Sequence, residues 1–122
     1  LMKRLAETGA KVFLVNTGWH GGQYGSAQSA RYPIAVTRQI VNAVIDEHYD
    51  ASAMATLPGF GLAMLQHVEG VDASWLDPRN RWQDANAYRQ ASITLMEAFS
   101  ANIARFSLTD DILAVGPNAQ EL

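Results

Sequence analysis

The sequence contains no cysteine, which excludes disulfide bonds, thiolate nucleophiles and cysteine-based zinc sites. This absence fits a reducing compartment, and we expect the chain to be cytoplasmic. No apolar run approaches the roughly 18 residues that a membrane-spanning helix requires, so no membrane segment is expected. The 9 Lys and Arg residues are scattered among 12 Asp and Glu residues, and without a basic face we expect no general binding to nucleic acid.

Catalytic signatures are missing as well. The chain has no serine in a G-x-S-x-G elbow, no H-E-x-x-H pair and no G-x-x-x-x-G-K-S/T phosphate loop. Gly18, Gly21 and Gly25 are spaced like part of such a loop, but the lysine that would reach the phosphates is absent. The acidic stretch 46–50 surrounds one histidine, does not specify a metal site and is interpreted as a solvated face. No catalytic residue and no metal ligand are therefore assigned.

The stretch 11–38 is the part around which the rest of the chain is expected to organise. A continuous apolar run predicts a strand over 11–16 that is buried on both faces. A glycine-rich loop follows at 18–25, and an amphipathic helix is expected from Thr37, its N-cap, to about His48. Glycines let a backbone approach a ligand closely, although a difficult turn alone would explain them equally well.

Two aromatic residues and one histidine lie in this loop. Trp19 and Tyr24 are either plugs that pin the loop to the body or platforms for a planar ligand. His20 is interpreted as a solvated loop residue.

The first residues predict a helix over 1–8 that ends at Gly9, a good residue for the position after a helix. Leu1 precedes Met2, and no Ser, Thr, Asp or Asn caps the start of the helix. We therefore expect that the chain was cut from a longer polypeptide. An artefact at the terminus would explain Leu1 but not the incomplete helix.

The second half of the sequence predicts a turn with a short strand at 57–62. It also predicts a compact polar segment at 77–82 whose side chains hold loops together by hydrogen bonds. Asp84 is expected to cap a long helix that ends near Phe106. Its apolar residues recur every three or four positions and are expected to form core: Tyr88, Ala91, Leu95, Phe99, Ile103 and Phe106. The segment 107–122 is expected to be a flexible tail that could fray.

Two sequence blocks make the chain recognisable. LVNTGW at 14–19 and DPRN-x-W at 77–82, with Tyr24-Gly25 and Arg31 between them, closely resemble the C-terminal part of the ATP-dependent phosphoenolpyruvate carboxykinases. The likeness covers nearly the whole chain. It implies an α/β fold in which 1–122 is a single partial domain, part of the C-terminal nucleotide-binding domain, with a strand, a glycine-rich loop and packed helices.

The resemblance also implies a reaction. Members of that family convert oxaloacetate and ATP to phosphoenolpyruvate, carbon dioxide and ADP in gluconeogenesis, using Mg²⁺ and Mn²⁺. Their phosphate loop, metal ligands and oxaloacetate-binding arginine lie upstream of the matching segment, so metals and oxaloacetate would be bound by parts not in this chain. This chain would bind ATP or ADP at the adenine end, and alone it is expected to be inactive.

The family pattern for adenine binding falls on Arg31, Tyr32, Pro33 and Thr37. A guanidinium can stack on a purine, backbone groups can read its edge, and a threonine hydroxyl can hydrogen-bond to it. The chain departs from the pattern in the link 26–30, which is longer than usual and has no basic residue. Pro33 also has no N–H to donate.

Because of these departures, a second hypothesis stays open: a non-catalytic, repurposed or remnant domain that acts in protein interaction. An excised piece would expose an apolar face and could form a homodimer through it.

Overall fold

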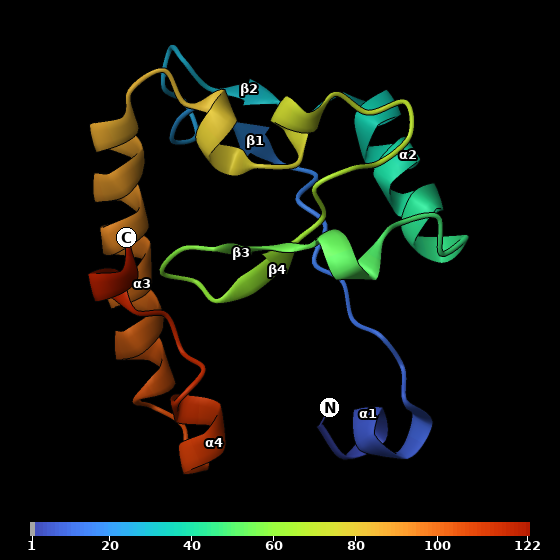
Figure 1. Cartoon of the computed structure of the whole chain (residues 1–122). Coiled ribbons are helices and arrows are strands. Elements are labelled where there is room, and N and C mark those ends of the chain that lie inside the picture. The colour runs from blue at the N-terminus through green and yellow to red at the C-terminus, as the bar shows by residue number, and fades with distance from the viewer. Residues whose placement is uncertain (1) are drawn as a thin grey trace.

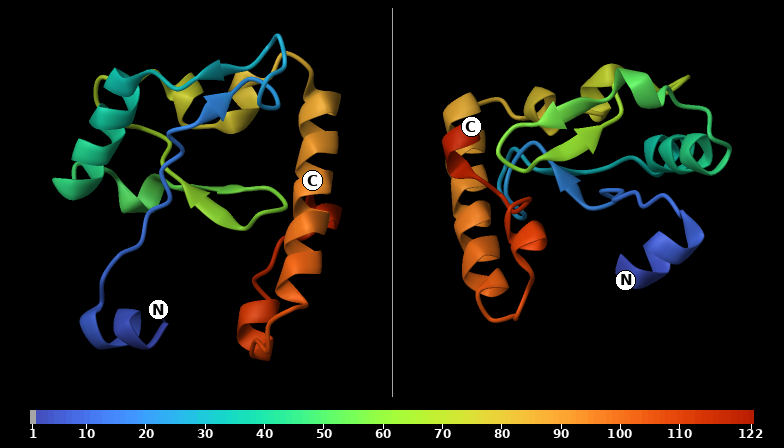
Figure 2. Two further views of the ribbon diagram at one scale, coloured as in Figure 1. Left: turned by 180° about the vertical axis from the view of Figure 1, so that it is seen from behind. Right: turned by 60° about the horizontal axis from the view of Figure 1, so that its bottom comes forward.

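Two short antiparallel hairpins lie between two long helices in the computed structural model, which describes residues 2–122 (Figure 1). Strands β1 (Trp19–His20) and β2 (Ala30–Arg31) form one hairpin, and β3 (Ala55–Leu57) and β4 (Leu62–Met64) form the other. Helix α2 (Ile34–Ile45) lies on one side of the hairpins and α3 (Ala85–Ile103) on the other, in all three views (Figures 1 and 2). The fold is therefore a mixture of helices and small antiparallel sheets.

The remaining elements are short. Helices α1 (Met2–Thr8) and α4 (Asp110–Leu113) lie near the two ends of the chain, and single turns of 3₁₀-helix occupy Ala51–Ala53, Ala73–Trp75, Pro78–Arg81 and Ala119–Glu121. Helix α1 ends as its sequence predicts, because Gly9 has φ of 63° and donates its N–H to Leu5 O at 2.8 Å. None of the helices among residues 2–122 is both long enough and apolar enough to cross a bilayer.

The strand expected over 11–16 is not formed. These residues belong to no strand, and Val12 and Leu14 are exposed rather than buried. A strand exists only when a neighbouring strand supplies its hydrogen bonds, and within the described residues none does so for 11–16. The prediction of a strand buried on both faces is therefore wrong for the chain as it stands.

Helix α2 begins one turn earlier than expected. Pro33 is its N-cap, with φ of −60° and ψ of 134°, so Thr37 lies inside the helix and the prediction of Thr37 as N-cap is wrong. Proline is compatible with a helix start because the N–H it lacks has no partner there in any case. The small core is built against this helix: Ala43, Val68 and Val71 are buried, and Trp75 and Leu76 pack on them.

The hairpin of β3 and β4 confirms the predicted turn. Thr56 pairs with Ala63, and the connection carries Gly59 at φ of 74° and Gly61 at φ of 64°. Left-handed backbone of this kind favours glycine because it has no Cβ to clash. The tight turn brings Gly59 against α3.

Helix α3 starts as expected, since Asp84 accepts hydrogen bonds from the N–H groups of Asn86 at 2.8 Å and Ala87 at 3.2 Å. The expected core stripe is wrong in part, because Leu95, Phe99 and Phe106 are 49%, 46% and 61% exposed. Ser92 and Met96 are the buried residues of the helix instead. The β3–β4 turn and the chain end cover only this narrow strip, so the rest of the apolar side faces solvent.

The segment 107–122 folds back along α3, and the C-terminus lies beside the middle of that helix (Figure 1). Asn118 donates its N–H to Gly59 O at 2.7 Å, and Arg89 donates a hydrogen bond to Leu122 O. The last residues thus touch both α3 and the β3–β4 turn. The flexibility of this tail stays a prediction.

Candidate functional site

The four residues expected at adenine lie close together in sequence, at the junction between β2 and α2. Arg31 ends β2, Tyr32 and Pro33 form the link, and Thr37 lies in the first turn of the helix. Two backbone hydrogen bonds hold the junction: Tyr32 N–H donates to Gly18 O at 3.0 Å, and Thr37 N–H donates to Pro33 O at 3.1 Å. The glycine-rich loop is therefore a closed hairpin that holds the start of α2 in place.

Arg31 faces solvent on this hairpin. It pairs with Trp19 across the two strands, and its guanidinium carbon lies 5.7 Å from the centroid of the Trp19 ring. Trp19 also contacts Tyr24 edge to face, with ring centroids 4.9 Å apart, while Tyr24 itself is exposed. The tryptophan thus supports the arginine side chain and leaves the other face of the guanidinium open for a planar group.

Tyr32 lies in a different environment from Arg31. The centroid of its ring lies 5.2 Å from that of His20 and 5.5 Å from that of Trp75, and the three rings form one half-buried aromatic cluster. Burial raises the pKa of the Tyr32 hydroxyl, and the nearby Arg81 cation partly opposes this. Arg31 lies over Trp19, whereas Tyr32 packs on His20 and Trp75, so the two side chains have different surroundings.

His20 is part of the cluster, and the interpretation of it as a solvated residue is wrong. Its ring contacts Trp75 edge to face, with ring centroids 4.8 Å apart. Its Nδ1 is buried without a hydrogen-bond partner among residues 2–122. Burial, together with the positive charge of Arg81, holds the pKa of His20 below its ordinary value. The neutral imidazole is therefore favoured.

Trp75 and Arg81 are site neighbours that the sequence did not reveal. The Arg81 guanidinium carbon lies 3.9 Å from the Trp75 ring centroid, and Arg81 Nε is buried without a partner in the described chain. The backbone of Arg81 also touches the loop, because a Cβ on Gly21 would lie 3.1 Å from Arg81 O. The contact between Arg81 and Gly21 joins segments far apart in the sequence, so no local sequence pattern pointed to it.

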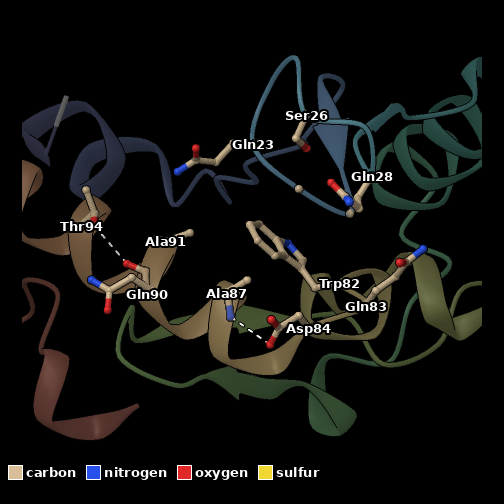
Figure 3. A pocket seen from close by; sticks show the side chains of 12 residues that line it. Gln23, Ser26, Gln28, Trp82, Gln83, Asp84, Ala87, Gln90, Ala91 and Thr94 are labelled. Carbon is tan, nitrogen blue, oxygen red and sulfur yellow. Dashed lines mark hydrogen bonds between the residues drawn. The ribbon is translucent and has the colours of Figure 1, made fainter.

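A cavity of about 500 Å³ lies between the glycine-rich loop and the start of α3 (Figure 3). Trp82 projects into it, with Gln23 and Ser26 on the opposite side (Figure 3). Its wall contains the carboxylate of Asp84, no lysine and no arginine. None of the four residues expected at adenine lines this cavity, so the cavity and the β2–α2 junction are separate features.

Metal binding finds no support in the described part of the chain. No group of three or more His, Cys, Asp or Glu side chains within residues 2–122 is arranged to hold an ion. The residues present therefore do not fit the Mg²⁺ or Mn²⁺ that the resemblance implies.

Comparison with known proteins extends the resemblance seen in the sequence. The family model described as phosphoenolpyruvate carboxykinase matches residues 1–74. An ATP-dependent phosphoenolpyruvate carboxykinase of Rubrobacter xylanophilus is 39% identical over 97% of this chain and 22% of its own length. Enzymes of the same name from Geobacillus thermodenitrificans and Bacillus subtilis are 42% and 39% identical, over 90% and 95% of this chain and 20% and 22% of their own lengths.

The chain belongs to the phosphoenolpyruvate carboxykinase family. It spans about a fifth of the length of the curated relatives that it matches. Within this carboxykinase segment, the DPRN block forms the 3₁₀ turn Pro78–Arg81, where Asp77 accepts from Arg79 N–H at 2.9 Å and braces the loop as expected. The link 26–30, where the sequence departs from the family pattern, supplies Ser26 and Gln28 to the cavity wall.

Proposed function

We propose that this chain is the adenine-binding portion of an ATP-dependent phosphoenolpyruvate carboxykinase that acts in the cytoplasm in gluconeogenesis. The complete enzyme would convert oxaloacetate and ATP to phosphoenolpyruvate, carbon dioxide and ADP. The observation that carries the proposal is the position of Arg31, exposed and backed by Trp19 at the start of α2, in a chain of this family. A purine that stacked on the free face of the guanidinium would meet Tyr32 and Pro33 through their backbone, with Thr37 in the first turn of the helix that follows.

The backbone at this junction favours adenine over guanine. Tyr32 N–H is engaged by Gly18 O, Pro33 has no N–H, and Pro33 O accepts from Thr37 N–H, so the two link residues offer the Tyr32 carbonyl oxygen and no free N–H donor. Adenine presents an exocyclic amino group that can donate to this oxygen. Guanine presents a carbonyl oxygen at the same position, which would face another acceptor.

Chemistry on the phosphates is assigned to other parts of the enzyme. Phosphoryl transfer depends on metal ions, lysine and arginine groups arranged around the phosphates. Mg²⁺ and Mn²⁺ would supply charge neutralisation there, and oxaloacetate would bind there too. We therefore expect the isolated chain to bind nucleotide and to leave oxaloacetate unchanged.

Calorimetric titration of the isolated chain with ATP and GTP tests this proposal. We expect ATP to bind more tightly, and Arg31→Ala to weaken ATP about 2- to 30-fold, the range that a cation–π contact of about 0.5–2 kcal/mol allows. Arg38→Ala is the matched control, because Arg38 is an exposed arginine on the next turn of α2. Equal affinity for ATP and GTP, or an equal effect of the two substitutions, would contradict the proposal.

A second candidate function is a non-catalytic module that acts through protein contacts, and the exposed side of α3 favours it. Leu95 and Phe99 on α3, and Phe106 just beyond the end of that helix, all lie open to solvent. Large apolar side chains in one area mark interaction surfaces, and a homodimer through this side of α3 would cover them. Light scattering over a range of concentrations tests the dimer, and a mass that stays monomeric throughout would rule it out.

A further inference from the structure

The cavity between the glycine-rich loop and α3 has two walls, and their backbones meet beside it at Gly21. This glycine has φ of 79°, and a Cβ on it would lie 2.8 Å from Gln28 O and 3.1 Å from Arg81 O. Any larger side chain would push the loop away from the 3₁₀ turn that precedes α3. The cavity itself measures about 500 Å³, within the size range of small-molecule sites.

The loop wall is held by its own turns. Ser26 N–H donates to Gln23 O at 3.0 Å, and Ser29 donates to Ser26 O from its N–H at 3.1 Å and from its Oγ at 2.9 Å. These turns carry the side chains of Gln23 and Gln28 at the cavity. Because the turns lie largely in the link 26–30, where the sequence departs from the family pattern, this wall belongs to this chain and is not a general feature of the family.

Trp82 supplies a flat aromatic surface from the opposite wall. Its side chain projects into the cavity (Figure 3). The ring of Tyr88 contacts the indole edge to face, with ring centroids 5.7 Å apart, and fixes its orientation. Ala87 and Ala91 line the cavity on the same side, so small side chains leave room next to the indole.

Neutral amide groups make up most of the polar lining. Both walls contribute glutamines, namely Gln23, Gln28, Gln83 and Gln90. None of these carboxamides has a hydrogen-bond partner among residues 2–122. Each can donate and accept at once, as can a hydroxyl group, so the lining suits a ligand that carries several hydroxyls.

The charge of the lining disfavours an anion. Asp84 is the one charged residue in the wall, and its Oδ1 already accepts from the N–H groups of Asn86 and Ala87. The start of α3 therefore has no free N–H at these positions for a phosphate or carboxylate. An anion would meet the negative charge of Asp84 with no lysine or arginine to offset it.

We propose that this cavity binds a neutral pyranose sugar, with the ring stacked on Trp82. A pyranose carries C–H groups on its faces and hydroxyls around its edge, which matches an indole surrounded by amides. The Oδ2 of Asp84 is free to accept from one of these hydroxyls. An organic cation would use Trp82 and Asp84 alone and leave the amide N–H groups without acceptors. The inference goes beyond the proposed function, since none of the four residues expected at adenine lines the cavity.

NMR titration of the ¹⁵N-labelled chain tests the proposal, with D-glucose as the probe. We expect saturable binding with a dissociation constant of about 1–10 mM, the strength that a ligand of this size allows. The indole N–H signal of Trp82 should move, whereas those of Trp19 and Trp75 should not. No shift of the Trp82 signal, or equal shifts of all three indoles, would overturn the proposal.

Two further probes decide the ligand class. D-Glucose 6-phosphate presents the same ring with an anionic group, and should bind at least about 10-fold more weakly than glucose because of Asp84. Choline tests for a cation site, and it should bind more weakly than glucose. Tighter binding of either probe than of glucose would overturn the assignment to a neutral sugar.

Substitutions in both walls locate the site. Gln23→Ala and Gln90→Ala should each weaken glucose binding about 2- to 12-fold, the range for one lost hydrogen bond. Gln66→Ala is the matched control, because Gln66 is an exposed glutamine that does not line the cavity. Trp82→Leu should weaken binding about 10-fold or more, and a thermal melt checks that it folds. If it does not fold, the glutamine variants decide. Equal effects of Gln66→Ala and the cavity variants would overturn the site.

ATP separates this inference from the proposed function. Glucose should bind with the same affinity whether or not ATP is present, because the two ligands are assigned to different parts of the chain. Competition between them would give the cavity to the nucleotide and overturn the sugar site. Intact glucose binding in a chain that fails to bind ATP would contradict the proposed function alone.

Discussion

Arg81 stacks its guanidinium on Trp75, with the guanidinium carbon 3.9 Å from the centroid of the ring. None of the ion pairs found among residues 2–122 includes Arg81, so the aromatic face is its main partner in the described chain. The same tryptophan packs against His20. The Arg81 guanidinium and the His20 imidazole therefore both contact the Trp75 indole, which also packs on Tyr32, one of the residues expected at adenine.

Replacing Arg81 should raise the pKa of His20. Arg81→Met removes the positive charge that disfavours the imidazolium, whereas Arg81→Lys keeps it and should leave the pKa lower than in the methionine variant. The methionine variant should also lose about 0.5–2 kcal/mol of stability with the cation–π contact. Titration of the imidazole signals by NMR measures the shift. An unchanged His20 pKa in Arg81→Met would show that burial alone sets it.

The stability of the chain should fall as the pH is lowered through the range in which histidine titrates. The folded-state pKa of His20 lies below its ordinary value of 6.5, so the unfolded chain takes up the proton more readily. The contribution of neutral His20 is complete above about 6.5 and is lost as the pH falls from there towards the lowered folded pKa. Urea unfolding at a series of pH values between about 7.5 and 5.5 measures the loss.

His20→Gln is the variant that isolates this effect, because glutamine does not titrate. Its stability should change less with pH than that of the parent. His48→Gln is the matched control, since His48 is exposed and belongs to no aromatic pair found among residues 2–122. If His48→Gln flattened the pH dependence as much as His20→Gln, the aromatic cluster would not be its source.

Removal of the Asp84 cap should weaken the start of α3. Asp84→Ala deletes the acceptor for the N–H groups of Asn86 and Ala87, and a lost N-cap costs about 1 kcal/mol. For a domain of this size, a change of about 1 kcal/mol corresponds to about 3–6 °C in melting temperature. Asp84→Asn keeps an acceptor and should stay close to the parent in a thermal melt. Equal losses for both variants would assign the effect to charge rather than to the cap.

Local features of this chain could be predicted because a few neighbouring residues decide them. Gly9 ends α1, Asp84 caps α3, and the turn of β3 and β4 forms where its glycines allow it. Each depends on backbone geometry or on a hydrogen bond within four residues. Such interactions form in the same way whatever the rest of the protein does.

Features that depend on distant partners could not be predicted in the same way. The run Val12–Val15 has the pattern of a buried strand, but pairing needs a second strand that the described residues do not supply. The apolar side of α3 shows the same limit, since periodicity identifies a side that can be buried and not what covers it. The contact of His20 with Trp75 joins residues 55 positions apart, which no local pattern reveals.

The candidate adenine residues fall between these two cases. The motif assigns Arg31, Tyr32, Pro33 and Thr37 by resemblance, and local structure explains how β2 and the first turn of α2 hold them. The different surroundings of Arg31 and Tyr32 come from their aromatic contacts with Trp19 on one hand and with His20 and Trp75 on the other. The partner of Arg31, in contrast, is set by the pairing of Trp19 across the hairpin, which depends on the length of the loop between them.

Gly59→Ala should be costlier than the same change at Gly61, although both glycines lie in one turn and both have positive φ. A Cβ at Gly59 would overlap Met96 Cε and lie 3.0 Å from Leu122 Cγ, whereas a Cβ at Gly61 would meet nothing within 4 Å. Backbone strain alone costs about 1–2 kcal/mol, and the overlap at Gly59 adds a further ~1–3 kcal/mol. Urea unfolding of the two variants measures the difference. Because Leu122 must move, Gly59→Ala should also speed protease cleavage within 107–122, and equal cleavage in both variants would show that the tail does not rest on this turn.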